Sequence, residues 1–305
     1  MTEPPAVRAV GLTKRFGHTT ALDDLSMDVA PGEVLGYLGP NGAGKTTTIR
    51  LMLGLLRPSG GRCEIFGLDA HRQSVEAHRR LAYVAGEANL WPQLTGAETL
   101  HVLGQVHGSV DQAYRDALID QFELDPTKRV RSYSKGNRQK VILIAALMSR
   151  ADLLVLDEPT AGLDPLMERA FRDAVRHAKG RGQTVFLSSH IMSEVEALCD
   201  RVAILRNGKL VESGTLAELR HLSALSVDAV FAGPPPDLSR VPGVRHVEAA
   251  GHAVHFEVQG SIGPLIAELA TTDVTALQSR EPSLEELFIT LYGDADAQRR
   301  SDADR

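Results

Sequence analysis

One loop of the sequence combines the residue types that hold phosphate groups in proteins. Its residues are Gly39, Pro40, Asn41, Gly42, Ala43, Gly44, Lys45, Thr46 and Thr47. They fit the pattern G-x-x-x-x-G-K-[ST], in which glycines let consecutive backbone N–H groups turn toward one anion. An apolar run precedes the loop and a helical run follows it, so the loop opens a helix whose dipole attracts negative charge. The pattern predicts a site for the phosphates of a nucleotide.

The polar side chains of this loop have separate expected tasks. We expect Lys45 to reach the β- and γ-phosphates, Thr46 to bind Mg²⁺, and Thr47 to lie on the α-phosphate side. Together these tasks describe a nucleoside triphosphate with its metal ion. A glycine-rich turn that simply precedes a helix, without any ligand, is the alternative.

Two adjacent carboxylates end a later apolar segment. Asp157 and Glu158 follow the run Leu-Leu-Val-Leu at residues 153–156. Ligands of open α/β sheets bind at the carboxyl ends of the strands. We therefore expect Asp157 to hold Mg²⁺ beside Thr46, and Glu158 to orient or deprotonate the water that attacks the γ-phosphate. An exposed acidic pair without chemistry is the alternative to this predicted hydrolysis site.

Alternating β and α segments position these residues along the chain. Short strands are expected in the first forty residues and at 62–66 and 81–84, and strands and helices alternate again from residue 153 to residue 205. Such alternation predicts an α/β fold with a mainly parallel, doubly wound sheet. Residues 95–149 show apolar spacing near 3.6 and form a predicted helical insertion.

The remainder of the chain predicts a second, smaller unit. Residues 223–292 read as a small α/β domain, with strands at 225–231 and 254–258 and a helix at 262–269. A proline-rich connector lies inside it at 233–237. Residues 293–305 are almost entirely polar and are expected to be disordered.

Composition excludes several classes of protein. The formal charge of −6 disfavours a general nucleic-acid binder, so no nucleic-acid partner is expected. No run approaches the ~20 apolar residues that cross a bilayer, and the N-terminus lacks the features of a signal peptide. Cys63 and Cys199 lack metal-ligand spacing and are expected to be free buried thiols. A role at a membrane would therefore require a partner.

A third motif brings a family resemblance. The run Tyr-Ser-Lys-Gly-Asn-Arg-Gln-Lys at residues 133–140 resembles the L-S-G-G-Q signature of ABC ATPases, in the Y-S-K-G form common in drug-export subunits. Ser134 is also a natural helix cap. The segment that contains Asp164 resembles the D-loop of the family, and His190, after two serines, matches its switch histidine. Phe16 matches the aromatic residue that stacks on adenine, with a place in the core as the alternative.

The resemblance implies a fold and an assembly. It implies a P-loop NTPase (RecA-like) core with an antiparallel β subdomain, the helical insertion, and a cassette that spans residues 1–222. It also implies a head-to-tail homodimer that encloses two ATP and Mg²⁺. In such a dimer Lys45, Glu158 and His190 would be catalytic in one copy, and Ser134 and Gly136 of the other copy would face them. Asp164 would join the nucleotide-binding set.

The sequence departs from the family pattern at one functional position. Gly86 stands where the family normally has a glutamine that contacts Mg²⁺ and signals to the membrane partner. Glu87 is the next residue, one position out of register. Trp91, the only tryptophan, lies nearby in a region where the family forms the groove for its permease, and burial in the helical subdomain is the alternative for it.

The resemblance predicts an ATP-hydrolysing motor subunit that drives a separate membrane permease. The resemblance to drug exporters makes a drug, an antibiotic or a lipid-like compound the expected cargo. Residues 281–292 resemble the C-terminal helix of such exporters, which favours export over import. The expected location is the cytoplasmic face of the membrane. An importer ATPase and a non-transport ABC protein acting on ribosomes or DNA are the alternatives. A GTPase is disfavoured because no N-K-x-D motif occurs.

Overall fold

The structure is a computed structural model that describes residues 3–106, 110–221, 224–280 and 283–287. The chain divides into two compact units, Met1–Ser213 and Gly214–Arg305. The domain limits expected from the sequence, 1–222 and 223–292, stay predictions. The tail 293–305, expected to be disordered, lies outside the described residues.

A six-stranded sheet forms the centre of the first unit. Its strand order is β10-β9-β3-β8-β7-β6, and every pairing from β9 to β6 is parallel. Strands β3, β7 and β8 are buried along their whole length, as expected for central strands of a parallel sheet. The bounds are β3 (Val34–Leu38), β6 (Leu81–Val84), β7 (Leu153–Asp157), β8 (Thr184–Ser189), β9 (Arg201–Arg206) and β10 (Lys209–Thr215).

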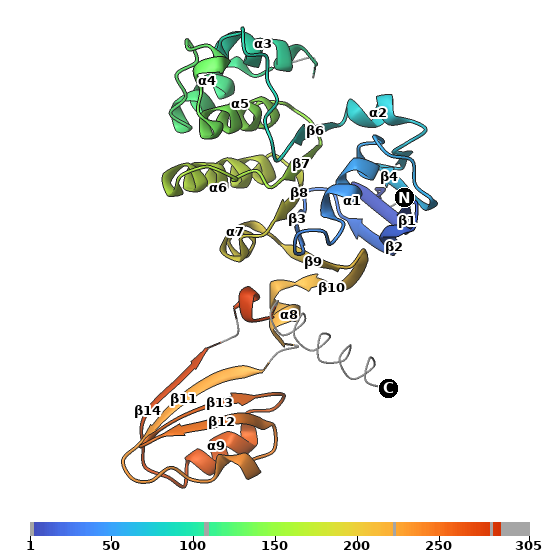
Figure 1. The fold of residues 1–305 in the computed structure, drawn as a ribbon. Coiled ribbons are helices and arrows are strands. Elements are labelled where there is room, and N and C mark those ends of the chain that lie inside the picture. The colour runs from blue at the N-terminus through green and yellow to red at the C-terminus, as the bar shows by residue number, and fades with distance from the viewer. Residues whose placement is uncertain (1–2, 107–109, 222–223, 281–282, 288–305) are drawn as a thin grey trace. The chain divides into compact units, whose positions relative to one another are not determined.

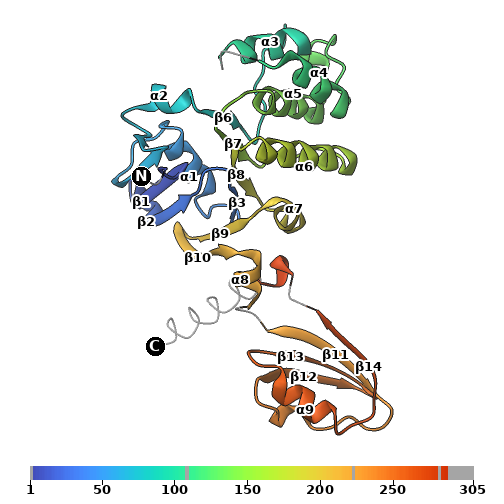
Figure 2. The same cartoon turned by 180° about the vertical axis from the view of Figure 1, so that it is seen from behind.

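Helices cover both faces of this sheet. Figure 1 shows α1 on one side, with the N-terminal strands, and α5, α6 and α7 on the other, and Figure 2 shows the same layers from behind. Helix α6 carries its apolar residues on one face, so it packs on the sheet and leaves a polar face outside. The bounds are α1 (Lys45–Met52), α2 (Ser74–His78), α6 (Pro165–Gly180) and α7 (Met192–Leu198).

A second, antiparallel sheet packs beside α1. Its strand order is β2-β1-β4-β5. One buried apolar cluster joins this sheet, α1 and the central sheet, and it includes Leu25, Ile49 and Phe186. The helix that follows the phosphate loop is therefore anchored in a continuous core. The bounds are β1 (Val7–Phe16), β2 (Thr19–Val29), β4 (Gly60–Ile65) and β5 (Leu68–Asp69).

The helical block lies between β6 and β7 in the sequence, as the apolar spacing predicted. Thr95 and Glu98 exchange side-chain-to-backbone hydrogen bonds and form a capping box at the first of its helices. The Tyr133 hydroxyl donates to the Asp125 carbonyl at 2.6 Å. This bond fixes the segment that leads into α5, the last helix of the block. The bounds are α3 (Gly96–Val106), α4 (Gln112–Gln121), the 3-10 turn η1 (Val130–Ser132) and α5 (Lys135–Leu147).

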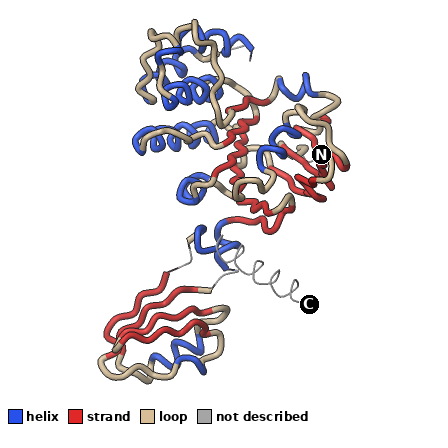
Figure 3. The backbone as a smooth tube through the Cα atoms, in the orientation of Figure 1, coloured by secondary structure: helices blue, strands red, loops and turns tan. Residues whose placement is uncertain are grey.

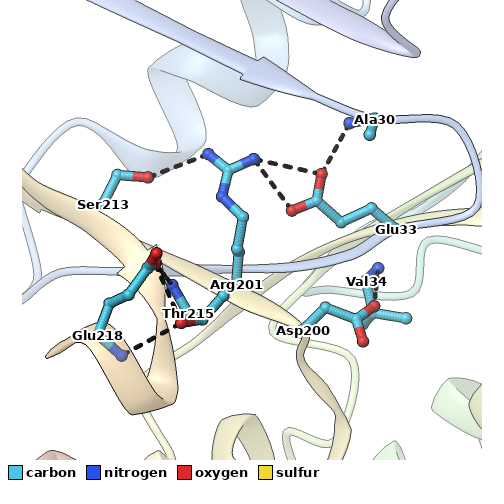
Figure 4. A network of polar contacts seen from close by, with 8 residues as sticks. All are labelled: Ala30, Glu33, Val34, Asp200, Arg201, Ser213, Thr215 and Glu218. Atoms are coloured by element: carbon cyan, nitrogen blue, oxygen red, sulfur yellow. Dashed lines mark hydrogen bonds and ion pairs between the residues drawn. The ribbon is translucent and has the colours of Figure 1, made fainter. Parts of the chain in front are cut away.

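A polar network ties the first residues of β3 to β9 (Figure 4). Arg201 lies at its centre, with Nη1 3.1 Å from Glu33 Oε1 and Nη2 donating to Ser213 Oγ at 3.3 Å. Asp200 accepts a hydrogen bond from the backbone N–H of Val34 at 2.9 Å. Since β3 leads directly into the phosphate loop, this network fixes the register of the strand that delivers the loop.

The second unit is a four-stranded antiparallel sheet with one helix against it (Figure 3). Its core includes Val227, Phe256 and Leu265. Thr215 and Glu218 form a capping box at α8, drawn in Figure 4. The bounds are α8 (Leu216–His221), β11 (Leu225–Phe231), η2 (Leu238–Arg240), β12 (Val244–Ala250), β13 (Ala253–Val258), α9 (Gly263–Leu269) and β14 (Val274–Arg280).

The segment that resembles an exporter's terminal helix, residues 281–292, is described only at 283–287. There the Leu287 N–H donates to the Ser283 carbonyl at 3.1 Å, and Leu284 is buried. The other residues of that segment lie outside the described part.

Two glycines allow a test of how tightly β1 and β4 approach each other. Gly61 has φ 68°, and a Cβ there would collide with the Gly11 carbonyl, whereas Gly17 has φ 57° and open space around it. We expect Gly17→Ala to lower the free energy of unfolding by about 1 kcal/mol, from backbone strain alone, and Gly61→Ala to lower it by about 3 kcal/mol. Urea unfolding followed by the fluorescence of Trp91 measures both, and equal losses would contradict the close approach.

Candidate nucleotide-binding and hydrolysis site

The predicted phosphate loop has the backbone that its glycines allow. The loop leaves β3 after Leu38, and α1 begins at Lys45. Gly42 and Gly44 adopt left-handed φ angles of 81° and 112°, which disfavour any residue with a Cβ. At Gly39 a Cβ would lie 2.6 Å from the Leu205 carbonyl oxygen. Three glycines are therefore required by geometry, before any ligand is considered.

Lys45 folds back over the loop that precedes it. Its side chain is only 6% exposed, and Nζ donates to the Gly39 carbonyl at 2.5 Å and to the Pro40 carbonyl at 3.3 Å. Burial lowers the pKa of Lys45, and the negative charges of Glu158 and Asp157 oppose that shift. The ammonium group thus lies at the loop rather than in solvent.

Asp157 is the buried end of β7. Ser188 Oγ donates a hydrogen bond to Asp157 Oδ1 at 2.8 Å. Burial raises the pKa of Asp157, the neighbouring charge of Glu158 raises it further, and the Ser188 hydroxyl lowers it. Sequence reasoning gave Ser188 no task of its own. The only feature of the sequence that could have indicated a role for Ser188 was its position at the end of the strand that follows the acidic strand.

Strand register brings the three predicted motifs to one edge of the sheet. Leu38 pairs with Ser189 across β3 and β8, and Asp157 pairs with Ser188 across β7 and β8. The phosphate loop, the acidic pair and His190 therefore follow adjacent strand ends directly. This is the edge at which open α/β sheets bind ligands.

Glu158 lies between two nitrogen-bearing side chains. Its Oε1 is 4.0 Å from Lys45 Nζ and 3.6 Å from His190 Nδ1. Its backbone has a left-handed φ of 47°, and its N–H donates to the Ser188 carbonyl at 3.0 Å. Left-handed non-glycine residues are strained and cluster at functional sites. The three residues expected to be catalytic are thus brought together.

Ser134 and Gly136, which are expected to face a second copy, and Asp164, which is expected to join the nucleotide-binding set, all lie at helix starts. Ser134 Oγ accepts from the Asn137 N–H at 3.2 Å and caps α5. Asp164 accepts from two N–H groups and caps α6. A Cβ at Gly136 would lie 2.8 Å from the Gly162 carbonyl oxygen, so the signature glycine lies against the D-loop segment. No hydrogen bond or ion pair between described residues joins this group to the phosphate loop, and its nucleotide role stays a prediction.

Both singled-out aromatic residues are on the surface. Phe16 is 47% exposed and Trp91 48%, so neither takes the core position that was its alternative. The Lys14 ammonium lies 5.0 Å from the centre of the Phe16 ring. Trp91 lines a hollow with Tyr83, Leu90 and others. Stacking of Phe16 on adenine stays a prediction.

Thr46, expected to bind Mg²⁺, is exposed at the start of α1, and Thr47 is half-buried.

Gly86 lies beside the acidic strand end. A Cβ at this position would be 3.3 Å from the Asp157 carbonyl oxygen and 4.0 Å from Glu158 Cβ. The position is therefore where a longer side chain would reach the site. Glu87 is exposed and lines the hollow with Trp91 instead.

Two buried polar residues at the site were missed by sequence reasoning. Gln139, 1% exposed on α5, donates through Nε2 to the Pro159 carbonyl at 2.9 Å. Glu194 is buried on α7 and accepts a hydrogen bond from the Ser189 hydroxyl at 2.6 Å. Neither follows a local pattern, since each is a common helix residue whose partner lies on a distant segment.

A phosphate loop between a buried parallel strand and a helix, with an acidic pair on a nearby strand end, defines a P-loop nucleoside triphosphatase. Comparison with known proteins defines it further.

A family model described as ABC transporter matches residues 22–161. A daunorubicin resistance ATP-binding protein of Streptomyces coeruleorubidus is 34% identical, over 95% of this chain and 96% of that protein. A bacitracin transport ATP-binding protein of Bacillus licheniformis is 33% identical, over 94% of this chain and 97% of that protein. A solved ATP-binding subunit of an ABC transporter has a TM-score of 0.66 and 31% identity, over 70% of this chain and 92% of that chain.

The chain therefore belongs to the ABC transporter family, as an ATPase subunit. The resemblance and the α/β P-loop fold predicted from the sequence are confirmed.

Removing the Lys45 ammonium tests the phosphate loop. We expect Lys45→Ala to lower ATP hydrolysis by about 100-fold or more, because the charge that stabilises the transferring phosphoryl group is lost. Release of inorganic phosphate from the full chain measures it. Lys128→Ala, which removes an exposed lysine of the helical block, is the matched control and should hydrolyse ATP normally. Undiminished turnover by Lys45→Ala would contradict the assignment.

Proposed function

We propose that the chain is a motor subunit that dimerises around two ATP and powers a separate membrane permease, for export of a drug, antibiotic or lipid-like compound. One observation carries the catalytic part of this proposal: Lys45, Glu158 and His190 converge at one strand edge. The export part is supported by the relatives, which are named for daunorubicin resistance and bacitracin transport.

The geometry of Glu158 suits it to the attacking water. Its side chain is about one third exposed, so a water molecule can reach it, and Lys45 Nζ lies 4.0 Å away. A water that donates to this carboxylate would lie next to the γ-phosphate held by Lys45. His190 Nδ1 lies 3.6 Å from the same carboxylate oxygen. Glu158 thereby orients the water or accepts its proton.

Mg²⁺ fits the two oxygen groups expected to bind it. The Thr46 hydroxyl is exposed at the helix start, and Asp157 presents a carboxylate held by Ser188. Within the described chain, no group of three or more His, Cys, Asp or Glu residues could hold a metal by itself. Mg²⁺ commonly takes one or two protein ligands and completes its shell with phosphates and water. When bound, it neutralises phosphate charge during hydrolysis.

The signature residues are proposed to serve the second copy. Ser134 and Asp164 are exposed at helix starts, and neither they nor Gly136 bond to the phosphate loop of their own chain within the described residues. A helix start carries partial positive charge suited to the phosphates of an ATP on the opposite copy. Two-fold symmetry then gives two equivalent sites.

The hollow around Trp91 is the proposed contact with the permease. It is lined by Tyr83, Leu90, Trp91 and Ile142, and an apolar hollow with an aromatic rim suits an amphipathic helix. In the part of the chain that the structure describes, no helix has the length and apolar character to span a bilayer. The proposed location is the cytoplasmic face of the membrane, held there by the permease. An importer ATPase is the remaining alternative within transport.

Replacing the proposed base tests both catalysis and dimerisation. We expect Glu158→Gln to lower hydrolysis by about 100-fold or more, since an amide cannot accept the proton of the water. ATP should then persist and hold two chains together. Analytical ultracentrifugation with saturating Mg-ATP should show a dimer, and Lys45→Ala combined with Glu158→Gln should stay monomeric. A monomeric Glu158→Gln chain would refute the shared site.

Removing the exposed indole tests the proposed permease contact. We expect Trp91→Ala to lower recovery of the chain with the permease proposed as its partner by about tenfold, because an aromatic anchor that becomes buried at such an interface contributes about 1.4 kcal/mol or more. Val75→Ala, which shortens another exposed apolar side chain, should have no effect. Both variants should hydrolyse ATP normally in isolation. Full recovery with Trp91→Ala would exclude this surface.

A further inference from the structure

Glu194 carries a buried carboxyl group, and its burial lowers the stability of the fold. It lies on α7 with a side chain only 4% exposed. One of its oxygens, Oε1, is buried and has no hydrogen-bond partner among the described residues. A buried carboxyl group is expensive unless its oxygens are satisfied, and an apolar residue would pack α7 at lower cost. Burial raises the pKa of Glu194.

The other oxygen of Glu194 holds the turn that carries His190. Ser189 Oγ donates to Glu194 Oε2 at 2.6 Å. The same hydroxyl oxygen accepts from the Ile191 N–H at 3.0 Å. The Ser189 hydroxyl therefore links residue 189, before His190, to the backbone N–H of residue 191, after it. Glu194 fixes this hydroxyl to helix α7.

Glu194 also contacts the segment that carries Glu158. The Thr160 hydroxyl lies near its carboxyl group, and this hydroxyl and the hydrogen bond from Ser189 both lower the pKa of Glu194 against the effect of burial. Thr160 is itself buried and lies two residues after Glu158. A turn with an Ala161 N–H bond to the Glu158 carbonyl at 3.2 Å connects them. The Glu194 carboxyl group thus holds the segment of His190 through Ser189 and lies beside the segment of Glu158, and the side chains of these two segments meet at 3.6 Å in the site.

We propose that Glu194 is a positioning residue for ATP hydrolysis, which fixes the turn of His190 through the Ser189 hydroxyl and packs beside Thr160 in the segment of Glu158. It contacts neither catalytic side chain directly. The inference rests on the ATPase function proposed above. It predicts that loss of the carboxyl group displaces Glu158 and His190 together, while the phosphate loop keeps its affinity for ATP.

Three single variants of the full chain separate this role from ordinary packing. We expect Glu194→Ala to lower kcat by about tenfold or more with KM within about twofold, because small displacements of catalytic groups are costly. Glu194→Gln keeps one acceptor oxygen and should retain kcat within about threefold. Val195→Ala, at the next buried position of α7, should lower the melting temperature without lowering kcat. Equal kcat losses for Glu194→Ala and Val195→Ala would overturn the proposal.

A double-mutant cycle with Ser189→Ala tests the route of the effect. If Glu194 acts through the Ser189 hydroxyl, Ser189→Ala alone should lower kcat several-fold. Addition of Ser189→Ala to Glu194→Ala should then cause little further loss. If the kcat losses of the two single variants multiply in the double variant, or if Ser189→Ala has full activity, Glu194 does not act through Ser189. Ser189→Ala and Glu194→Gln keep the test decisive should Glu194→Ala fail to fold.

Amide hydrogen exchange supplies a readout that does not depend on hydrolysis. Exchange in residues 158–161 and 189–191 should be faster in Glu194→Ala than in the unchanged chain, and Val195→Ala should not share this effect. Unchanged exchange in both segments would overturn the proposed tie. If the chain without substitutions hydrolyses no ATP, the proposed function is refuted instead. The exchange rates would still show whether Glu194 positions the two segments.

Discussion

The parallel register of β3, β8 and β7 is the constraint on which the site depends. Leu38 lies beside Ser189 and Asp157 beside Ser188, so three chain segments leave the sheet at the same edge. A shift of one residue in either pairing would separate the phosphate loop from the acidic pair by more than 3 Å, because a strand rises about 3.3 Å per residue. The continuous burial of these strands and the Arg201–Glu33 network oppose such a shift.

The rigid sheet also supports a strained residue at the reacting end. Glu158 has a left-handed backbone, which costs about 1–3 kcal/mol for a residue with a side chain. Bonds from several elements hold it: its own N–H to the Ser188 carbonyl, and Gln139 to the next carbonyl along the chain. Asp157 accepts from Ser188, whereas Glu158 lies near Lys45 and His190, so the two consecutive acids face different groups, as the proposed metal and water roles require.

Local patterns predicted the parts of this protein that local geometry defines. The glycines of the phosphate loop could be recognised because the backbone there tolerates nothing larger, and the acidic pair because it ends an apolar strand. The tie from Glu194 to Ser189 could not be recognised, because a glutamate on a short helix resembles any surface glutamate until the fold buries it. In the second unit, β12 and β14 expose most of their residues, so the alternation that identifies a strand is weak.

Gly86 has no side chain beside the acidic strand end, where the family pattern has a glutamine. A glutamine there would extend from the loop toward the metal side of Asp157, but Gly86 offers only backbone, close to the Asp157 carbonyl. The sheet itself provides one connection, since Val84 of β6 pairs directly with Leu156 of β7. A hydrogen-bonded strand pair transmits displacement along its axis without a polar side chain. For the permease coupling proposed here, we expect movement of the acidic strand end to reach the loop of residues 85–91 through β6 and its backbone.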